Sequence, residues 1–124
     1  MTGVQTCALP ISEGKYHFPA LNELSGRIRE CIEDHGFSKP NNSNVAEKLM
    51  LTVTELSEAL EFARDGNFDL FFDGLKPDGF PAELADAIIR ILDMCAAMNI
   101  DIAKVLALKM GYNESRPVRH GRQF

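Results

Sequence analysis

Apolar residues recur at spacings of three and four in two segments of the chain, which is the period of an amphipathic helix. The first segment covers residues 19–35 and presents Leu21, Leu24, Ile28 and Ile32. The second runs from Asn44, whose side chain suits a helix cap, to about Asp65. Gly36 and Gly66 follow the two segments directly, as glycine often does after a helix. The main stripe of the second segment, which we expect to face the core, consists of Leu49, Val53, Leu56, Leu60 and Ala63.

A third helix is predicted from Pro81, a residue favoured in a first turn, through AELADAIIRILDMCAAMN, which is apolar around most of its circumference. A fourth, IAKVLALKMGYN, follows Asp101 as its cap, and the tail SRPVRHGRQF is expected to be extended or looped because Pro117 ends the helix. Between the second and third helices, GNFDLFFDGLKPDGFP is interpreted as an ordered loop without strands. The pattern predicts an all-α four-helix bundle, in which the second and third helices need a second subunit to bury their faces.

Length and composition fit one globular domain, with 124 residues, 45% of them apolar and 25% charged. Thirteen basic and eighteen acidic residues give a net charge of -5, which repels the phosphates of polymeric DNA and RNA. A bound divalent metal can reverse the sign of a carboxylate-lined pocket, so a small phosphorylated substrate is not excluded. Three cysteines without a CxxC or Cys/His cluster favour a reducing cytoplasm. No apolar run approaches the roughly 20 residues that a membrane span requires.

The first twelve residues, MTGVQTCALPIS, differ from the rest of the chain. Thr2 to Ile11 can be encoded by a nucleotide sequence that resembles a common short-read sequencing adapter. We therefore interpret residues 1–12, with Cys7, as translated adapter and exclude them from the fold. Residues 13–124 are expected to form a single helical domain with a basic C-terminal tail.

Four carboxylates stand in two pairs, each with a spacing of three, on the second and third predicted helices: Glu55 with Glu58, and Glu83 with Asp86. Each pair lies on one helix face, so two packed helices can direct all four at one point. One such pair alone is usually a solvated face, but carboxylates among apolar neighbours are costly unless they are paired or bound to metal. The combination favours a magnesium or manganese site. Salt bridges to Arg90 or Lys109 are the structural alternative.

The fourth predicted helix carries Lys109 and Asn113 at a spacing of four, and the helical wheel places them on the inward stripe with Ile102 and Leu106. A single lysine there would usually pack its stem and extend its amine to solvent. Beside a metal site, Lys109, Asn113 and Arg116 would supply donors for phosphate oxygens and for the polar edges of a nucleotide.

Three stretches together resemble the MazG-like family of all-alpha nucleoside triphosphate pyrophosphohydrolases: EKLMLTVTELSEALEFARDG, KPDGFPAELADAIIRILDMC and DIAKVLALKMGYNESRPVRHG. The resemblance covers roughly Glu47 to the C-terminus. The family pattern EExxE followed by ExxD appears here as TELSE and ELAD, so Thr54 stands where a first glutamate is usual. The segment KMGYN resembles the nucleotide-contacting K-x-x-x-N of the family.

The resemblance implies hydrolysis of a (d)NTP to the monophosphate and pyrophosphate, in a homodimer or homotetramer. It implies that Mg2+, with Mn2+ as an alternative ion, grips the triphosphate and is held by Glu55, Glu58, Glu83 and Asp86. Lys109 and Asn113 would contact the substrate, and Arg116 matches the family less firmly. Two alternatives stay open. One is a related enzyme for a modified nucleotide, and the other is a non-catalytic helical dimer that binds a nucleotide or a partner protein, with the carboxylates in a salt-bridge network.

Overall fold

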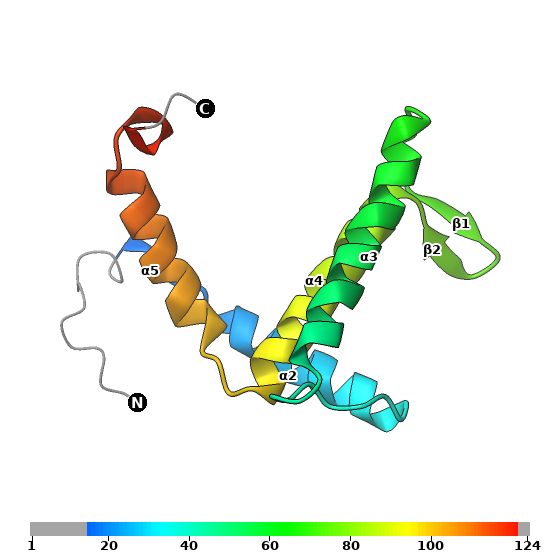
Figure 1. Ribbon diagram of the computed structural model, residues 1–124, viewed down its shortest axis with the longest axis horizontal. Coiled ribbons are helices and arrows are strands. Elements are labelled where there is room, and N and C mark those ends of the chain that lie inside the picture. Colours follow the sequence, from blue (N-terminus) through cyan, green and yellow to red (C-terminus); the bar gives the residue numbers. More distant parts are fainter. Residues whose placement is uncertain (1–14, 122–124) are drawn as a thin grey trace. The chain divides into compact units, whose positions relative to one another are not determined.

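The computed structural model describes residues 15–121, and this part of the chain is mainly helical (Figure 1). Its elements are α2 (Pro19–Asp34), α3 (Val45–Arg64), β1 (Phe71–Asp73), β2 (Lys76–Asp78), α4 (Phe80–Ala97), α5 (Ile102–Ser115) and the short 3-10 helix η2 (Val118–Gly121). Residues 1–12, interpreted as translated adapter, lie outside the described range. No helix within that range is both long and apolar enough to cross a bilayer.

The four predicted helices are present close to their expected limits, which confirms a mainly α fold. Pro81 stands in the first turn of α4, and the Asp101 carboxylate caps α5 by accepting a hydrogen bond from the Lys104 amide at 3.1 Å. Asn44 precedes α3, but its side chain does not cap the helix. It bonds the backbone of the preceding loop instead. The tail is not wholly extended, because η2 forms a short turn after Pro117.

The prediction of a loop without strands between α3 and α4 is wrong. Phe71 pairs with Asp78 and Asp73 with Lys76 in an antiparallel hairpin. Glycine, proline and aspartate favour a loop, but Gly74 and Gly79 lie outside the strands. Pro77 and the two aspartates fit strands of three residues because each strand has an unpaired outer edge. The hairpin leads into α4 through Gly79, whose φ is 103°. A Cβ at Gly79 would lie 2.5 Å from the Asp69 carbonyl oxygen, so this junction requires glycine.

The chain divides into two compact units, of which one is Ser25–Ile100. Its main feature is the packing of α3 against α4, which run antiparallel because a single hairpin joins them (Figure 1). Ala59 of α3 and Ala87 of α4 are almost completely buried, and such small side chains allow the two helices to approach closely. The other buried apolar residues of this unit are Leu92, Met94 and Cys95 of α4 and Pro40 in the loop before α3.

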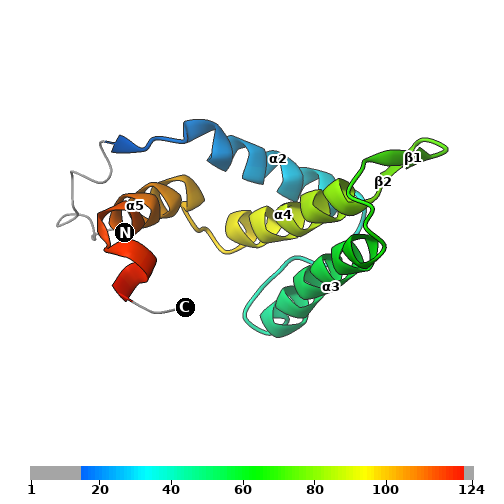
Figure 2. The same cartoon turned by 90° about the horizontal axis from the view of Figure 1, so that it is seen from above.

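Within the same unit, α4 lies between α3 and the later part of α2 (Figure 2). The Ser25 hydroxyl of α2 donates a buried hydrogen bond of 2.5 Å to the Leu92 carbonyl oxygen of α4. One helical turn further along α2, Arg29 forms a 2.9 Å ion pair with Asp93. Two polar contacts therefore fix this part of α2 on α4.

The other unit combines the residues before Ser25 with those from Asp101 onward. Asn22 ties its two segments together: its amide donates to the Asp101 carboxylate at 2.7 Å, and its side-chain oxygen accepts from the Ala103 amide at 3.1 Å. Lys15 and Tyr16 both contact the Glu114 carboxylate. The buried residue of α5 is Ala107.

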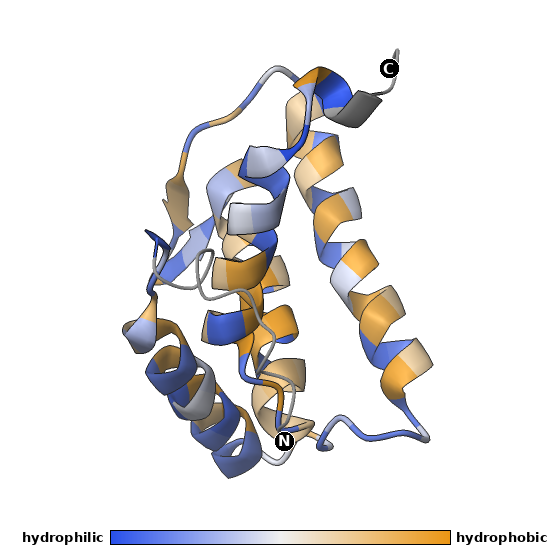
Figure 3. Ribbon diagram, turned by 90° about the vertical axis from the view of Figure 1, so that its left-hand side faces the viewer, coloured by the Kyte–Doolittle hydropathy of each residue, from blue (hydrophilic) through white to orange (hydrophobic). Residues whose placement is uncertain are grey.

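The stripe of α3 expected to face the core is not buried in the single chain. Its four large residues are 48–53% exposed: Leu49, Val53, Leu56 and Leu60. The helix instead buries Thr52, Glu55 and Ala59. On a helical wheel this contact side is turned by about 100° from the apolar stripe. Apolar residues consequently run along α3 and α4 without being enclosed (Figure 3).

Candidate metal site

Three of the four predicted carboxylates converge where α3 packs against the start of α4. One oxygen from each of Glu55, Glu58 and Glu83 lies within 4.8 Å of the others. Glu55 and Glu58 share a face of α3, as their spacing predicted, and Glu83 stands in the first turn of α4. Glu55 and Glu83 are buried, with 9% and 6% of their surface exposed, whereas Glu58 is exposed. The helix pair therefore presents an oxygen-lined group that is open on one side.

Asp86 lies one turn along α4 from Glu83 and is not a member of this group. Burial of its carboxyl and the negative charge of Glu55 raise the pKa of Asp86, and the positive charge of Arg90 opposes the shift. Asp86 and Glu55 both line the adjoining cavity. The structure thus puts the fourth predicted carboxylate beside the group.

The crowding of these carboxylates has its clearest effect on the pKa of Glu83. Its burial and then the charges of Glu58, Asp86 and Glu55 raise the pKa of Glu83 from 4.5 to about 7. Negative charge gathered in a poorly solvated place disfavours ionisation of each further carboxyl. A cation placed among these oxygens would remove that repulsion.

Arg90 provides part of the compensating charge. Its Nε donates to Glu55 Oε1 at 2.8 Å, so the salt bridge considered from the sequence is present. One guanidinium cannot neutralise three carboxylates and Asp86 together. The group therefore keeps a net negative charge that a divalent ion can satisfy.

The hairpin adds two residues that sequence reasoning missed. Lys76 and Asp78 both influence the pKa of Asp86, Lys76 by lowering it and Asp78 by raising it. The Gly79 amide donates to Asp78 at 2.8 Å, and this hydrogen bond is the main reason why the pKa of Asp78 is lowered. Their sequence signal was the KPDG segment, whose strand character was not recognised.

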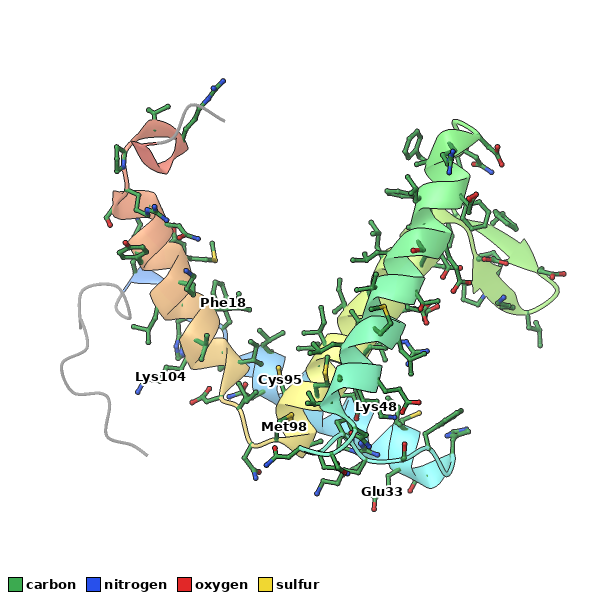
Figure 4. All side chains as sticks on the ribbon, in the orientation of Figure 1. Phe18, Glu33, Lys48, Cys95, Met98 and Lys104 are labelled. Carbon is green, nitrogen blue, oxygen red and sulfur yellow. The ribbon has the colours of Figure 1, made fainter. Side chains whose placement is uncertain are left out.

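A cavity of about 410 Å³ adjoins the carboxylates on the side of α2. Its polar lining consists of Lys48, Glu55, Asp86, Arg90 and Asp93. Its apolar lining consists of Ile32, Phe37, Pro40, Leu51, Ile89 and Met94. Lys48, near the start of α3 (Figure 4), donates to the Ser38 hydroxyl at 2.9 Å and so meets the loop that closes this side. Small-molecule sites commonly combine an apolar lining with a few polar groups in this way.

Asp93 is a second group that sequence reasoning missed, although its charge interrupts an otherwise apolar helix. Its side chain is 8% exposed and pairs with Arg29, which is 11% exposed. Burial raises the pKa of Asp93, and the charges of Arg29, Lys48 and Arg90 oppose the shift. The ion pair therefore places a charged side chain in the wall of the cavity.

The predicted substrate-contacting residues belong to the other unit. Lys109 and Asn113 lie on α5 and are exposed, so the expectation that they occupy an inward stripe is wrong for the single chain. The Lys109 amine lies 5.6 Å from the centre of the Tyr112 ring, and the Arg116 guanidinium carbon lies 5.4 Å from it. Tyr112, which the sequence did not single out, thus gathers two cations around one ring.

The carboxylate group offers oxygen donors, carries net negative charge and adjoins a cavity. A site of this kind is suited to binding a hard divalent cation together with a small molecule. Comparison of the chain with protein-family models, with curated proteins and with solved structures finds no match.

Proposed function

We propose that the chain is a magnesium-dependent nucleoside triphosphate pyrophosphohydrolase that converts a (d)NTP and water into a (d)NMP and pyrophosphate. The observation that carries this proposal is the convergence of Glu55, Glu58 and Glu83 within 4.8 Å beside a cavity. The resemblance of TELSE, ELAD and KMGYN to the MazG-like family supplies the reaction type. We also propose the bundle architecture of that family for the assembled protein, in a reducing cytoplasm, where the thiols of Cys31 and Cys95 stay free.

The residues present fit a divalent ion. Glu55, Glu58 and Glu83, joined by Asp86, would hold Mg2+ or Mn2+. Burial and the neighbouring carboxylates raise the pKa of Glu83, so the group lacks full charge compensation even though Arg90 pairs with Glu55. The bound ion would supply Lewis-acid charge to the phosphate oxygens and lower the pKa of water.

The other residues of the site would position the substrate. Arg90 holds the Glu55 carboxylate in place, since the pair is bonded at 2.8 Å. Ile32, Phe37 and Leu51 offer apolar surface to the nucleoside in the cavity. We assign Lys109, Asn113 and Arg116 to the phosphates and the nucleotide on the resemblance, and the Tyr112 ring would hold two of these donors near one another.

A second candidate function has one observation in its favour. The Arg90–Glu55 pair is the kind of contact expected if the carboxylates form a salt-bridge network in a non-catalytic helical dimer that binds a nucleotide or a protein. Such a protein would bind ligand without turnover. A related activity on a modified nucleotide would use the same carboxylates and differ only in the substrate.

Phosphorus NMR of product mixtures tests the proposal. The full chain is incubated with a panel of ribo- and deoxynucleoside triphosphates, including base-oxidised ones, with Mg2+ or with chelator. Monophosphate and pyrophosphate that form only with Mg2+ are the expected products. Orthophosphate release would mean that a different bond is cleaved, and absence of turnover by folded protein would favour the non-catalytic dimer.

A matched pair of variants links turnover to the site. Glu58→Gln changes an exposed carboxylate of the group and should lower turnover at least about 100-fold, because one ligand of the ion is lost. Glu61→Gln changes an exposed carboxylate one turn further along α3 and should leave turnover unchanged. Equal rates in both variants and the unmodified chain would exclude the assignment.

A further inference from the structure

The cavity beside the carboxylates has two ends that differ in chemistry. Each helix lines it with two charged residues seven apart, Lys48 and Glu55 on α3 and Asp86 and Asp93 on α4. Seven residues are almost two turns, so each pair shares one helix face and spans roughly 10 Å along the axis. Because α3 and α4 run antiparallel (Figure 1), Glu55 and Asp86 stand at the end of the metal group. Lys48 and Asp93 stand at the other end, which we call the distal end.

Asp93 is the most deeply buried charged residue in the lining of the cavity. Its side chain is 8% exposed, and its Oδ1 lies 2.9 Å from Arg29 Nη1. That contact lacks the geometry of a hydrogen bond. Within the described part of the chain, Oδ1 and the three guanidinium nitrogens are buried without a hydrogen-bond partner. Since buried polar atoms are usually hydrogen-bonded, Asp93 places an acceptor with unused capacity in the cavity wall.

Lys48 supplies a donor near this acceptor. Its amine donates to the Ser38 hydroxyl at 2.9 Å, which leaves further N–H donors on the amine. Burial raises the pKa of Asp93, and the charges of Arg29 and Lys48 oppose that shift, so both cations lie close to the carboxylate. The distal end therefore combines a carboxylate, which only accepts hydrogen bonds, with an ammonium group, which only donates them.

Nucleobases differ in what they offer to such a pair. Cytosine, adenine and guanine each carry an exocyclic amino group beside an acceptor nitrogen of the ring, whereas thymine, uracil and hypoxanthine carry carbonyl oxygens and no amino group. An aspartate accepts from the amino group, and a lysine donates to the adjacent ring nitrogen. A carbonyl oxygen that faced Asp93 would instead bring two acceptors together in a poorly solvated place, which is costly.

We propose that Asp93 and Lys48 determine the base specificity of the site by selecting a nucleotide whose base carries an amino group. This assignment rests on the proposed function, which puts a nucleoside triphosphate in the cavity with its phosphates near Glu55 and Asp86. The base then lies at the distal end, with its amino group on the Asp93 carboxylate and the neighbouring ring nitrogen on the Lys48 amine.

The other residues near the distal end have supporting roles. Leu51 and Ile89 stand between the two ends of the cavity and offer apolar surface to the sugar and to the faces of the base. Arg29 does not line the cavity and reaches Asp93 from α2. It is therefore a positioning residue, which holds the carboxylate and keeps its negative charge favourable.

Nucleoside binding in the presence of chelator tests base recognition separately from hydrolysis. The full chain, labelled at its methyl groups, is titrated with deoxycytidine, deoxyadenosine and deoxyguanosine. Each is compared with the analogue that lacks only the amino group: 2-pyrimidinone deoxyriboside, purine deoxyriboside and deoxyinosine. The methyl resonances of Leu51 and Ile89 report occupancy of the cavity. At least one amino-bearing nucleoside should bind at least about tenfold more tightly than its analogue, because the analogue leaves the buried carboxylate without a donor.

The outcome of this titration separates the base specificity from the proposed function. The pair of ligands that shows the difference identifies the preferred base. Equal affinities within all three pairs, tighter binding of thymidine, shifts confined to methyl groups outside the cavity or no nucleoside binding at all would overturn the proposal. Hydrolysis of triphosphates alongside any of these results would leave the proposed function intact. Base discrimination by a chain that lacks turnover would remove the proposed function and leave the base specificity standing.

Variants separate the roles of the two residues. Arg29→Met with Asp93→Leu removes the carboxylate and its partner together, which avoids a buried unpaired charge, and should abolish the preference for the amino group. Lys48→Met should weaken each nucleoside and its analogue alike, by at least about threefold, because both keep the ring nitrogen. Lys39→Met, at an exposed lysine outside the cavity lining, should change neither.

Two results with these variants would contradict the assignment of roles. A double variant that keeps the preference would show that Asp93 does not read the base. A Lys48→Met variant that binds like the unmodified chain would show the same for Lys48. The titration of the unmodified chain decides the question even if a variant fails to fold.

Discussion

Arg90 of α4 donates a hydrogen bond from its Nε to the Glu55 carboxylate of α3 at 2.8 Å. One of the three carboxylates that converge at the candidate site is therefore already paired with a positively charged side chain. The Arg90 side chain is 38% exposed and the Glu55 side chain 11%. The pair therefore links the two helices and also limits the negative charge that is available to a metal ion. Its two effects can be separated by measurement.

Arg90→Gln should destabilise the metal-free protein and strengthen metal binding. The partly exposed ion pair contributes about 1 kcal/mol, so the free energy of unfolding in chelator should fall by that amount. Without the guanidinium, Glu55 and Asp86 attract a divalent ion more strongly, so the stabilisation on adding Mg2+ should exceed that of the unmodified chain. Thermal unfolding with and without Mg2+ measures both effects. Arg64→Gln, at the exposed end of α3, is the control, and a smaller Mg2+ effect in Arg90→Gln would contradict the prediction.

Metal-free stability should depend on pH through Glu83. The folded chain raises the pKa of Glu83 from 4.5 to about 7, so the folded state binds this proton more tightly than the unfolded state. The resulting stability is fully present below about pH 4.5 and is lost as the pH rises through about 7. In chelator, the free energy of unfolding should therefore fall by up to about 3 kcal/mol over this range.

Glu83→Gln cannot ionise and provides the comparison for that measurement. Its unfolding free energy should decline less between about pH 5 and pH 8 than that of the unmodified chain. Urea unfolding at fixed protein concentration gives both curves. Parallel curves would show that Glu83 keeps an ordinary pKa, in which case the crowding inferred at the site is not present.

The Arg29–Asp93 pair gives a prediction about stability alone. Arg29→Met leaves the Asp93 carboxylate buried without its partner, which should cost about 3 kcal/mol in the free energy of unfolding. Replacing both residues, Arg29→Met with Asp93→Leu, removes the charges together and should recover most of the loss. Arg27→Met, on an exposed side of the same helix, should be nearly neutral. If the double variant were as unstable as Arg29→Met, the cost would not come from an unpaired charge.

Two glycine substitutions should act in opposite directions. Gly79→Ala meets a positive φ and the Asp69 carbonyl oxygen, so it should destabilise the chain by more than about 1 kcal/mol. Gly26→Ala lies within α2 with no atom within 4 Å of the added Cβ, so it should stabilise the chain by up to about 1 kcal/mol. Urea unfolding followed by circular dichroism checks both. A neutral Gly79→Ala would mean that the hairpin junction adjusts without strain.

The period of the apolar residues was sufficient to place all four helices, because each helix needs one apolar side wherever it packs. It was not sufficient to identify the buried side of α3. Leu49, Val53, Leu56 and Leu60 form the more regular stripe, yet α3 contacts α4 through Thr52 and Ala59. The period of the apolar residues indicates which face of a helix avoids water, but it does not indicate which neighbouring element covers that face. The hairpin was missed because three-residue strands carry too few residues for alternation to be visible.

The spacing of three within each carboxylate pair determined by itself that Glu55 and Glu58 share one face of a helix, as do Glu83 and Asp86. Only the tertiary structure decided which of them meet, because the convergence depends on how closely α3 and α4 approach at Ala59 and Ala87. That approach unites Glu55, Glu58 and Glu83 and leaves Asp86 beside them. Local sequence sets the direction of side chains around one helix axis, whereas distances between helices depend on the packing of residues far apart in the chain.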